Sequence, residues 1–261
     1  MQGLLDLAEV PYVGAGVLGS ALGMDKGVFK DVMRAHNIPV LESIVVLRGE
    51  IEQDIESVLR RAEMLADFPL FAKPANLGSS VGITKCHNRS DLYEGLIEAA
   101  RFDRRVLIER GIEAREIEVS VLGNESPRVS VPGEILPSRE FYSYEAKYLD
   151  GTSGLVIPAP LSPELTRRVQ EYAKQAYRAI DCAGMARVDF LLDRRQVGGA
   201  GDGLYLSEVN TIPGFTQISM YPKLWEASGL AYPDLLDQLI NLALARKAQR
   251  DQLTRHFQRE D

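Results

Sequence analysis

Two apolar segments in the second half of the chain carry charged and amide side chains at alternate positions. Arg187 and Asp189 lie in the first segment, and Glu208 and Asn210 in the second. Alternate side chains of a β-strand share a face, so pairing of the two segments would gather all four groups. Two carboxylates and an amide oxygen repel one another unless a cation lies between them, and such oxygen ligands suit Mg²⁺ together with phosphate oxygens. The pattern predicts a nucleotide-triphosphate enzyme. The alternative, a solvated face with a surface salt bridge, fits two such apolar segments less well.

The composition is that of an ordinary globular protein. Of the 261 residues, 45% are hydrophobic and 26% charged, and 30 Lys and Arg against 37 Asp and Glu give a net charge of −7. A mildly acidic chain is a poor partner for nucleic acid or a membrane surface. No apolar run approaches the roughly 20 residues of a spanning helix, and the start shows no signal-peptide pattern. We therefore expect a cytoplasmic protein without nucleic-acid or membrane partners.

Cysteine and histidine are sparse. The only cysteines are Cys86 and Cys182, which form no C-x-x-C pair, and the three histidines are scattered. This usage predicts two free thiols in a reducing compartment and argues against a zinc site.

Hydrophobic periodicity predicts an α+β chain of two units. A helix over about 26–36, capped by Asp25, precedes a β-α-β-β-α-β pattern, which is typical of a compact α+β unit. Its expected elements are strand 43–47, helix 53–66, strands 69–73 and 83–86, a helix capped by Ser90 to about Arg101, and strand 106–109. The second unit begins near Glu116. Its expected elements are strand 117–122, an irregular segment 131–160, a helix capped by Ser162 to Ile180, strands 185–192 and 204–209, and a closing helix from about 233.

A Gly- and Ser-rich loop, 76–82, follows the expected strand 69–73. Its backbone N–H groups and hydroxyls could wrap phosphates, and Lys73 could neutralise them. The loop lacks the Gly-Lys-Ser/Thr of a Walker A motif. Residues 78–82 also match the hydrolase elbow G-x-S-x-G, but that elbow opens into a helix, whereas the β-rich residues 83–86 follow here. A surface hairpin is the remaining structural alternative.

A second glycine motif, 14–19, matches the dinucleotide fingerprint G-x-G-x-x-G. The strand before it is short, and a lone fingerprint has many false positives. We interpret it as a turn and a tight helix start.

Two further segments carry candidate ligand contacts. Segment 106–112 ends a strand at an expected hinge, where exposed backbone could read an adenine edge and Glu109 or Glu116 could take ribose hydroxyls. An ordinary surface strand end is the alternative. Segment 141–148 holds three tyrosines and a lysine, which favours a lid over a charged substrate; an aromatic loop packed on the core is the alternative.

The most specific string is 208–216, a strand that ends in a Pro-Gly turn. The Gly214 N–H could face a ligand there, and Ser219 lies within reach of the same pocket.

Four strings, 73–82, 145–148, 187–189 and 208–216, resemble the signatures of D-alanine–D-alanine ligases, members of the ATP-grasp superfamily. The match runs in order along nearly the whole chain. The resemblance implies an ATP-grasp fold with the nucleotide between two α+β units. It also implies a cytoplasmic homodimer that uses ATP and two Mg²⁺ or Mn²⁺ ions. ATP would phosphorylate one D-alanine, and the amine of a second would attack the acyl phosphate to give D-alanyl-D-alanine for peptidoglycan. A D-alanine–D-lactate type ligase and an inactive nucleotide-binding remnant are the rival interpretations.

The resemblance also implies roles for individual residues. The ATP contacts would be Lys26 and Lys73 on the phosphates, with Glu109, Arg110, Ile112, Glu116 and Phe141. The metal ligands would be Asp189, Glu208 and Asn210. The catalytic groups would be Arg187 and the Gly214 N–H on the oxyanion, with Ser79 and Tyr148 in the network that places the first D-alanine. Lys147 would lie near the transferred phosphoryl group and Ser219 near the second carboxylate.

The resemblance divides the chain into a remnant of a first domain (1–14), a central ATP-grasp subdomain (15–113) and a C-terminal catalytic subdomain (114–261). Compared with the family, about 80 to 90 residues of the first domain are missing, close to the size of a small domain. That domain carries a glutamate that orients the first D-alanine. We therefore expect this chain to bind ATP but to ligate D-alanine poorly.

Overall fold

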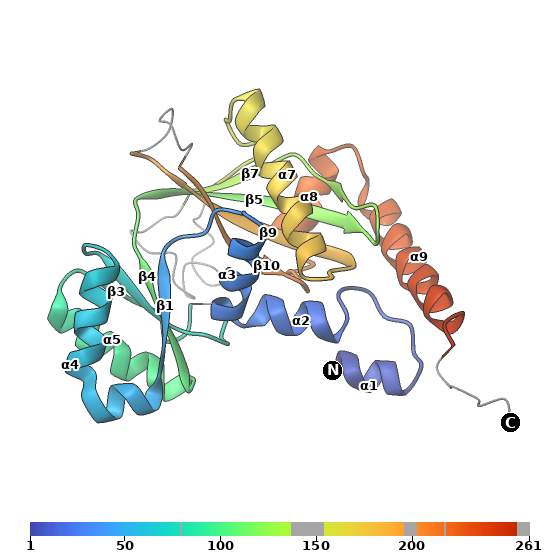
Figure 1. Ribbon diagram of the computed structural model, residues 1–261. Helices are drawn as coiled ribbons and strands as arrows, with labels where there is room; N and C mark the ends of the chain where they lie inside the picture. The colour runs from blue at the N-terminus through green and yellow to red at the C-terminus, as the bar shows by residue number, and fades with distance from the viewer. Residues whose placement is uncertain (79, 137–153, 196–202, 217, 255–261) are drawn as a thin grey trace, which may run out of the picture.

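A computed structural model describes residues 1–78, 80–136, 154–195, 203–216 and 218–254. Two antiparallel sheets, each with its own helices, organise these residues (Figure 1). The smaller sheet has the order β1-β4-β2-β3 and the larger the order β10-β9-β5-β7-β8, with β6 paired to β5. The two sheets lie side by side in the molecule, so a cleft between them can draw side chains from both.

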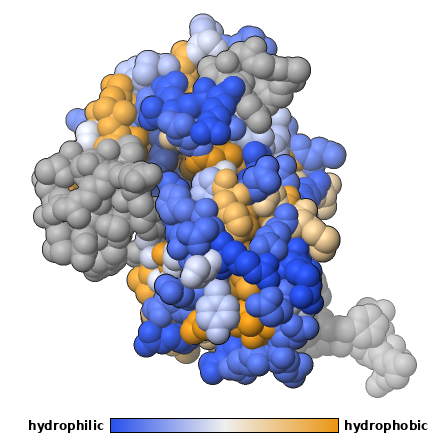
Figure 2. Space-filling view, turned by 90° about the vertical axis from the view of Figure 1, so that its left-hand side faces the viewer, coloured by the Kyte–Doolittle hydropathy of each residue, from blue (hydrophilic) through white to orange (hydrophobic). Residues whose placement is uncertain are grey.

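The smaller sheet confirms the predicted β-α-β-β-α-β unit. Its elements are β1 (Ser43–Leu47), α4 (Arg48–Leu65), β2 (Leu70–Pro74), β3 (Thr84–Cys86), α5 (Arg89–Phe102) and β4 (Arg105–Arg110). The helices α4 and α5 pack together on this sheet, where Val46, Leu70, Leu96 and Ile108 are buried in one core. Figure 2 shows the face of the molecule that lies on the left in Figure 1. Hydrophilic residues prevail on this face, with hydrophobic residues among them.

The larger sheet is covered on both faces. Its strands are β5 (Ala114–Gly123), β6 (Arg128–Val129), β7 (Gly133–Leu136), β8 (Gly154–Val156), β9 (Gly184–Asp193) and β10 (Leu204–Asn210). Its helices are α7 (Pro163–Ala179), α8 (Met220–Ala227) and α9 (Tyr232–Asp251). One core joins α7 to Val119, Val188 and Phe190. A second core joins α8 and α9 to Leu122 and Met185, which belong to the opposite face because their positions alternate with the first set.

Three helices precede the first strand: α1 (Gln2–Leu7), α2 (Val17–Met24) and α3 (Lys26–Ala35). Asp25 caps α3 as predicted, because its carboxylate accepts from the N–H groups of Gly27 and Val28. Phe29 and Met33, one helical turn apart, are buried in the core of the larger sheet. The opposite side of α3 is therefore directed away from that core.

The glycine motif 14–19 is a turn followed by a helix start, as predicted, since Gly16 is the N-cap of α2. Gly14 has a φ of 100°, which favours glycine. A side chain at Gly19 would place its Cβ 2.9 Å from the carbonyl oxygen of Ile180. Close packing and backbone conformation thus account for these glycines.

Several predicted details were wrong. Asn88, not Ser90, is the N-cap of α5, and its side chain accepts from the N–H groups of Ser90 and Asp91 at 2.9 and 3.0 Å. The helix expected from residue 53 begins at Arg48, although a non-helical Asp54 marks a kink near the expected start. Part of the segment expected to be irregular, 131–160, forms β7 and β8, which pair with each other. Helices α1 and α8 were not predicted.

Both cysteines are free, as expected, and both are buried. Burial raises the pKa of Cys86 to about 11 and that of Cys182 to about 12. Within the described ranges, no helix is both long and apolar enough to cross a membrane. The proposed boundaries of the central and C-terminal subdomains stay a prediction.

We predict that Asn88→Ala destabilises the chain by about 1 kcal/mol, which for a protein of this size lowers the melting temperature by roughly 2–4 °C. The reason is that two backbone N–H groups at the start of α5 lose their acceptor. Ser90→Ala is the matched control and should cost less than half as much. Thermal unfolding of both variants measures the difference. An equal loss in the two variants would restore Ser90 as the cap.

Candidate functional site

A cleft of about 880 Å³ lies between the two sheets, a size typical of small-molecule and cofactor sites. Strands β2 and β4, helix α3 and the loop after β2 line one side, and β5, β9 and β10 line the other. Cations of the first side include Lys26, Lys30, Lys73 and Arg110, and carboxylates of the second side include Glu116, Glu118, Asp189 and Glu208. The cleft therefore has a largely basic wall that faces a largely acidic one.

The four polar residues of β9 and β10 come together as the sequence predicts. The two strands are antiparallel neighbours, with Asp189 opposite Glu208 and Arg187 opposite Asn210. The guanidinium of Arg187 donates to both oxygens of Asp189, at 2.8 and 2.7 Å. The amide nitrogen of Asn210 donates to Asp189 and to Glu208, each at 3.0 Å. The carboxylates are thus held on one sheet face by two donors.

A β-bulge produces this alignment. The register of β10 against β9 shifts by one residue between Leu206 and Glu208, so Ser207 is the extra residue. In the unshifted register, Glu208 would lie opposite Val188 and point into the apolar core. The bulge turns its carboxylate to the face of Asp189, consistent with the frequent use of bulges to re-aim side chains at sites.

The neighbouring strand β5 contributes a third carboxylate that the sequence reasoning missed. Glu118 lies opposite Asp189 in the β5–β9 ladder, and its Oε2 is 3.0 Å from Nε of Arg187. Burial lowers the pKa of Arg187, but the charges of Asp189 and Glu118 outweigh it and raise this pKa well above its ordinary value. The alternation of Glu116 and Glu118 about an apolar residue was the available signal. Only the pairing of β5 with β9 shows that Glu118 lies beside Asp189 and Arg187.

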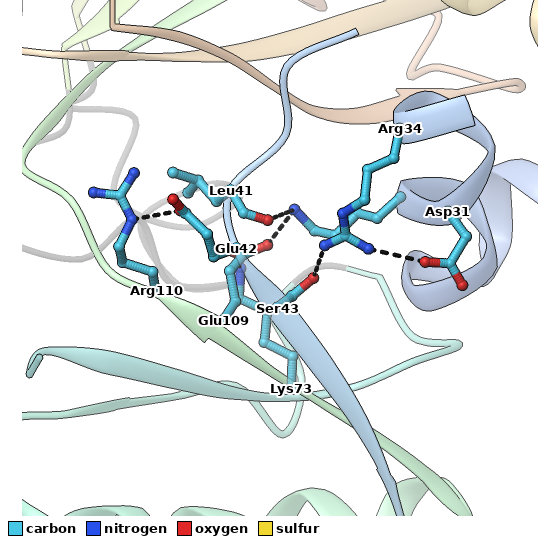
Figure 3. Close-up of polar contacts among 9 residues, drawn as sticks. Asp31, Arg34, Leu41, Glu42, Ser43, Lys73, Glu109 and Arg110 are labelled. Atoms are coloured by element: carbon cyan, nitrogen blue, oxygen red, sulfur yellow. Dashed lines mark hydrogen bonds and ion pairs between the residues drawn. The ribbon is translucent and has the colours of Figure 1, made fainter. Parts of the chain in front are cut away.

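The basic wall is organised around the buried Glu109 of β4. One carboxylate oxygen forms an ion pair with Lys73 of β2, and the other lies 2.6 Å from Nζ of Lys30 on α3. Figure 3 shows the side chains of Glu109 and Lys73 lying close together below Leu41. Burial raises the pKa of Glu109, but the two ammonium groups outweigh it and lower this pKa to about 2. Glu109 is therefore an anion between two cations.

Lys30 was not predicted as a site residue, although its position gives a signal. It lies four residues after Lys26 on α3, so the two lysines share a helix face. It is only 2% exposed. A buried lysine almost always has a partner, but the partner lies 79 positions away and cannot be read from local sequence.

Lys26 is the first residue of α3 and lines the cleft. Its ammonium group donates to the carbonyl oxygen of Leu77, in the loop after β2. The pKa of Lys26 is lowered, because the effect of burial outweighs the opposing effect of the negative charge of Glu208 across the cleft. Lys26 therefore holds the glycine-rich loop through Leu77 and is close enough to Glu208 to be affected by its charge.

The expected adenine and ribose contacts all line the cleft, namely Glu109, Arg110, Ile112 and Glu116. Arg110 points toward Glu42, to which it donates at 2.6 Å (Figure 3). It also lies over the ring of Tyr205, with 5.5 Å to the centroid. The ion pair with Glu42 and the contact with the ring of Tyr205, in β10, thus orient the guanidinium group of Arg110.

Gly214 and Ser219 lie near each other beyond the end of β10, since a Cβ at Gly214 would be 3.1 Å from the Ser219 hydroxyl. The Ser219 hydroxyl accepts from the N–H of Thr216 at 3.0 Å. Neither residue lines the cleft. Four other predicted residues, Ser79, Phe141, Lys147 and Tyr148, lie outside the described residues.

The residues present fit a divalent cation with a phosphate-bearing ligand. Two carboxylates and an amide suit a hard ion, which also takes phosphate oxygens and water. Lysine ammonium groups on the opposite wall suit phosphates.

Comparisons with known proteins agree with this arrangement. The family model described as D-ala D-ala ligase C-terminus matches residues 32–241. A D-alanine–D-alanine ligase of Thermoanaerobacter sp. (strain X514) is 58% identical over 245 residues, which are 94% of this chain and 66% of that protein. The corresponding ligase of Natranaerobius thermophilus is 48% identical and matches 98% of this chain and 69% of its own length. The chain spans about two thirds of the length of such relatives.

Two solved structures are similar in fold. The D-alanine–D-alanine ligase of Coxiella burnetii has a TM-score of 0.80 and 39% identity, over 96% of this chain and 65% of that one. The VanG D-Ala:D-Ser ligase of Enterococcus faecalis has a TM-score of 0.82 and 35% identity, over 93% and 68% of the two chains. The two sheets and the charged cleft between them thus define an ATP-grasp fold. Within that class, the chain belongs to the D-alanine–D-alanine ligase family.

We predict that Glu109→Gln lowers the free energy of unfolding at pH 7 by about 3 kcal/mol, because two buried ammonium groups lose their counter-ion. The pKa of Glu109 is depressed in the folded state, from 4.5 to about 2. Its stabilising effect is therefore complete above about pH 4.5 and is lost as the pH falls through 2.

Urea unfolding at pH 7, 4 and 3 tests this prediction. The difference between wild type and Glu109→Gln should shrink as the pH falls. Glu63→Gln is the control, because Glu63 pairs with Arg89 at the surface and its loss should matter much less. A difference for Glu109→Gln that stays constant with pH would contradict the assignment.

Proposed function

We propose that this protein carries out the ATP-dependent ligation of two D-alanines to D-alanyl-D-alanine. The γ-phosphoryl group of ATP is transferred to the carboxylate of the first D-alanine, which releases ADP and forms an acyl phosphate. The amine of the second D-alanine attacks the acyl carbon, and phosphate leaves. The supporting observation is a cleft with cations on one wall and Asp189 and Glu208 on the other, in a chain of the D-alanine–D-alanine ligase family.

Phosphoryl transfer depends on positioning and charge neutralisation more than on covalent chemistry. Lys26 and Lys73 are the proposed phosphate contacts. Both line the cleft beside the glycine-rich loop. Glu109, Arg110, Ile112 and Glu116 are the proposed adenine and ribose contacts, with Phe141 as a further contact to ATP.

Asp189, Glu208 and Asn210 are the proposed ligands of Mg²⁺ or Mn²⁺, with two ions per site. Asn210 turns its amide nitrogen toward the carboxylates, and its oxygen would take that place beside a cation. The bound ions would neutralise negative charge on the phosphates. Glu118 would remain as a partner of Arg187 when Asp189 turns to the metal.

Arg187 and the Gly214 N–H are the proposed donors to the tetrahedral oxyanion. One such donor is typically worth about 10²–10³ in rate. Ser79 and Tyr148 are proposed to place the first D-alanine, Lys147 to contact the transferred phosphoryl group and Ser219 to contact the second carboxylate. A homodimer and a cytoplasmic location remain predictions.

Product analysis tests the proposed reaction. We expect D-alanine-dependent release of ADP, with D-alanyl-D-alanine identified by mass spectrometry, from a version extended to the length of the relatives. The 261-residue chain should bind ATP and give much less product. Competing D-lactate and D-serine as second substrates distinguishes the related ligases. Binding of ATP without D-alanine-dependent turnover in either version would favour the inactive remnant.

We predict that Glu208→Gln weakens Mg–ATP affinity by roughly tenfold or more, because the metal loses one of two carboxylates. Affinity for ATP in the presence of EDTA should change little. Calorimetry measures both affinities, and thermal unfolding shows whether the fold is retained.

Glu134→Gln is the matched control for Glu208→Gln. Glu134 is a buried carboxylate of the same sheet, paired with Arg115 at 2.6 Å, and it does not line the cleft. The Glu134→Gln variant should lower the melting temperature, because Arg115 loses its ion-pair partner, without changing Mg–ATP affinity. Unchanged Mg–ATP affinity in Glu208→Gln would remove Glu208 from the metal site.

A further inference from the structure

The two lysines that share Glu109 differ in how firmly they are held. The side chain of Lys30 is 3% exposed, and that of Lys73 is 16% exposed. Lys30 also lies 3.5 Å from the carbonyl oxygen of Leu41 and projects from α3, whose Phe29 is packed in the core of the larger sheet. Lys30 is thus almost fully buried, at the base of the cleft wall.

Lys73 has a second environment available. It stands near the end of β2, directly before the glycine-rich loop, and its ammonium group lies 5.1 Å from the centroid of the Phe71 ring. Both residues line the cleft. A modest rotation of its side chain would turn Lys73 from Glu109 toward an anion in the cleft.

We propose that Lys30 is a positioning residue: it is the permanent counter-ion of Glu109, and it allows Lys73 to leave Glu109 for the phosphate groups of a nucleotide. The inference rests on the proposed nucleotide site. It adds a residue that acts through Glu109 and Lys73.

The charges explain why a second lysine is needed. Two ammonium groups and one carboxylate give the cluster a charge of +1. When Lys73 turns to a phosphate, Glu109 keeps a buried partner at 2.6 Å. Without Lys30, the departure of Lys73 would leave a buried carboxylate with no cation, which is strongly unfavourable. Lys73 would then remain with Glu109, and the phosphates would lose it.

Binding of ATP and of adenosine to Lys30→Met separates this role from a merely structural one. Adenosine carries no phosphate and does not require Lys73 to move. We expect ATP affinity to fall roughly 10- to 100-fold, whereas adenosine affinity changes less than threefold. Lys30→Arg, which keeps the charge, should retain more of the ATP affinity than Lys30→Met. An equal loss for the two ligands, or no loss for either, overturns the proposal.

A double variant tests whether Lys30 acts through Glu109. In the Glu109→Gln background, Lys73 has no carboxylate to hold it, so the further change Lys30→Met should alter ATP affinity less than threefold. A full additional loss overturns the proposal. Melting temperatures of all variants are measured alongside.

The unmodified chain provides a test that does not depend on the folding of a variant. Side-chain NMR of ¹⁵N-labelled lysine should show the Lys73 ammonium signal shifting on addition of ATP, while the Lys30 signal stays in place. Movement of Lys30 with Lys73 unchanged overturns the proposal. If the unmodified chain binds no ATP, the proposed function fails and this inference with it. Normal ATP binding in Lys30→Met overturns this inference alone.

Discussion

The antiparallel pairing of β9 with β10 is the constraint on which the acidic wall depends. The pairing places Asp189 opposite Glu208 and Arg187 opposite Asn210. The core side of the same strands carries Val188, Phe190 and Val209. In β10, Leu206 and Val209 can both lie in the core while Glu208 faces the cleft only because one extra residue, Ser207, resets the alternation between them.

Two ion clusters of opposite composition face the cleft. On the small-sheet side, Glu109 lies between Lys30 and Lys73, so cations outnumber the anion. On the large-sheet side, Arg187 lies between Asp189 and Glu118, so anions outnumber the cation. Each cluster has one more ion of the majority sign than of the minority sign. If one majority ion turns to a ligand, the other still pairs with the central buried ion. Burial of charge is tolerated in proteins when it is paired in this way. The arrangement matches the proposed ligand, a phosphate chain with divalent cations.

Helix α3 joins the two halves of the site. Phe29 and Met33 pack in the core of the larger sheet, while Lys26 and Lys30, on the neighbouring face of the helix, line the cleft. The cap by Asp25 sets where the helix begins, and Asp25 also lies 3.4 Å from Arg105 of β4. The position of the two lysines is therefore tied to both sheets rather than to a flexible connection.

Local sequence determined most of the elements and the side-chain faces of the strands. Alternation predicted that Arg187 and Asp189 share a face, Asp25 and Ser162 predicted helix starts, and the order of periodic segments predicted the smaller sheet. These features depend on residues a few positions apart. Tertiary structure alone decided the rest. The bulge at Ser207, the place of Glu118 beside Arg187 and the pairing of Lys30 with Glu109 join strands and helices distant in sequence. The free energy of such contacts comes from burial and charge pairing between distant segments, which no local pattern encodes.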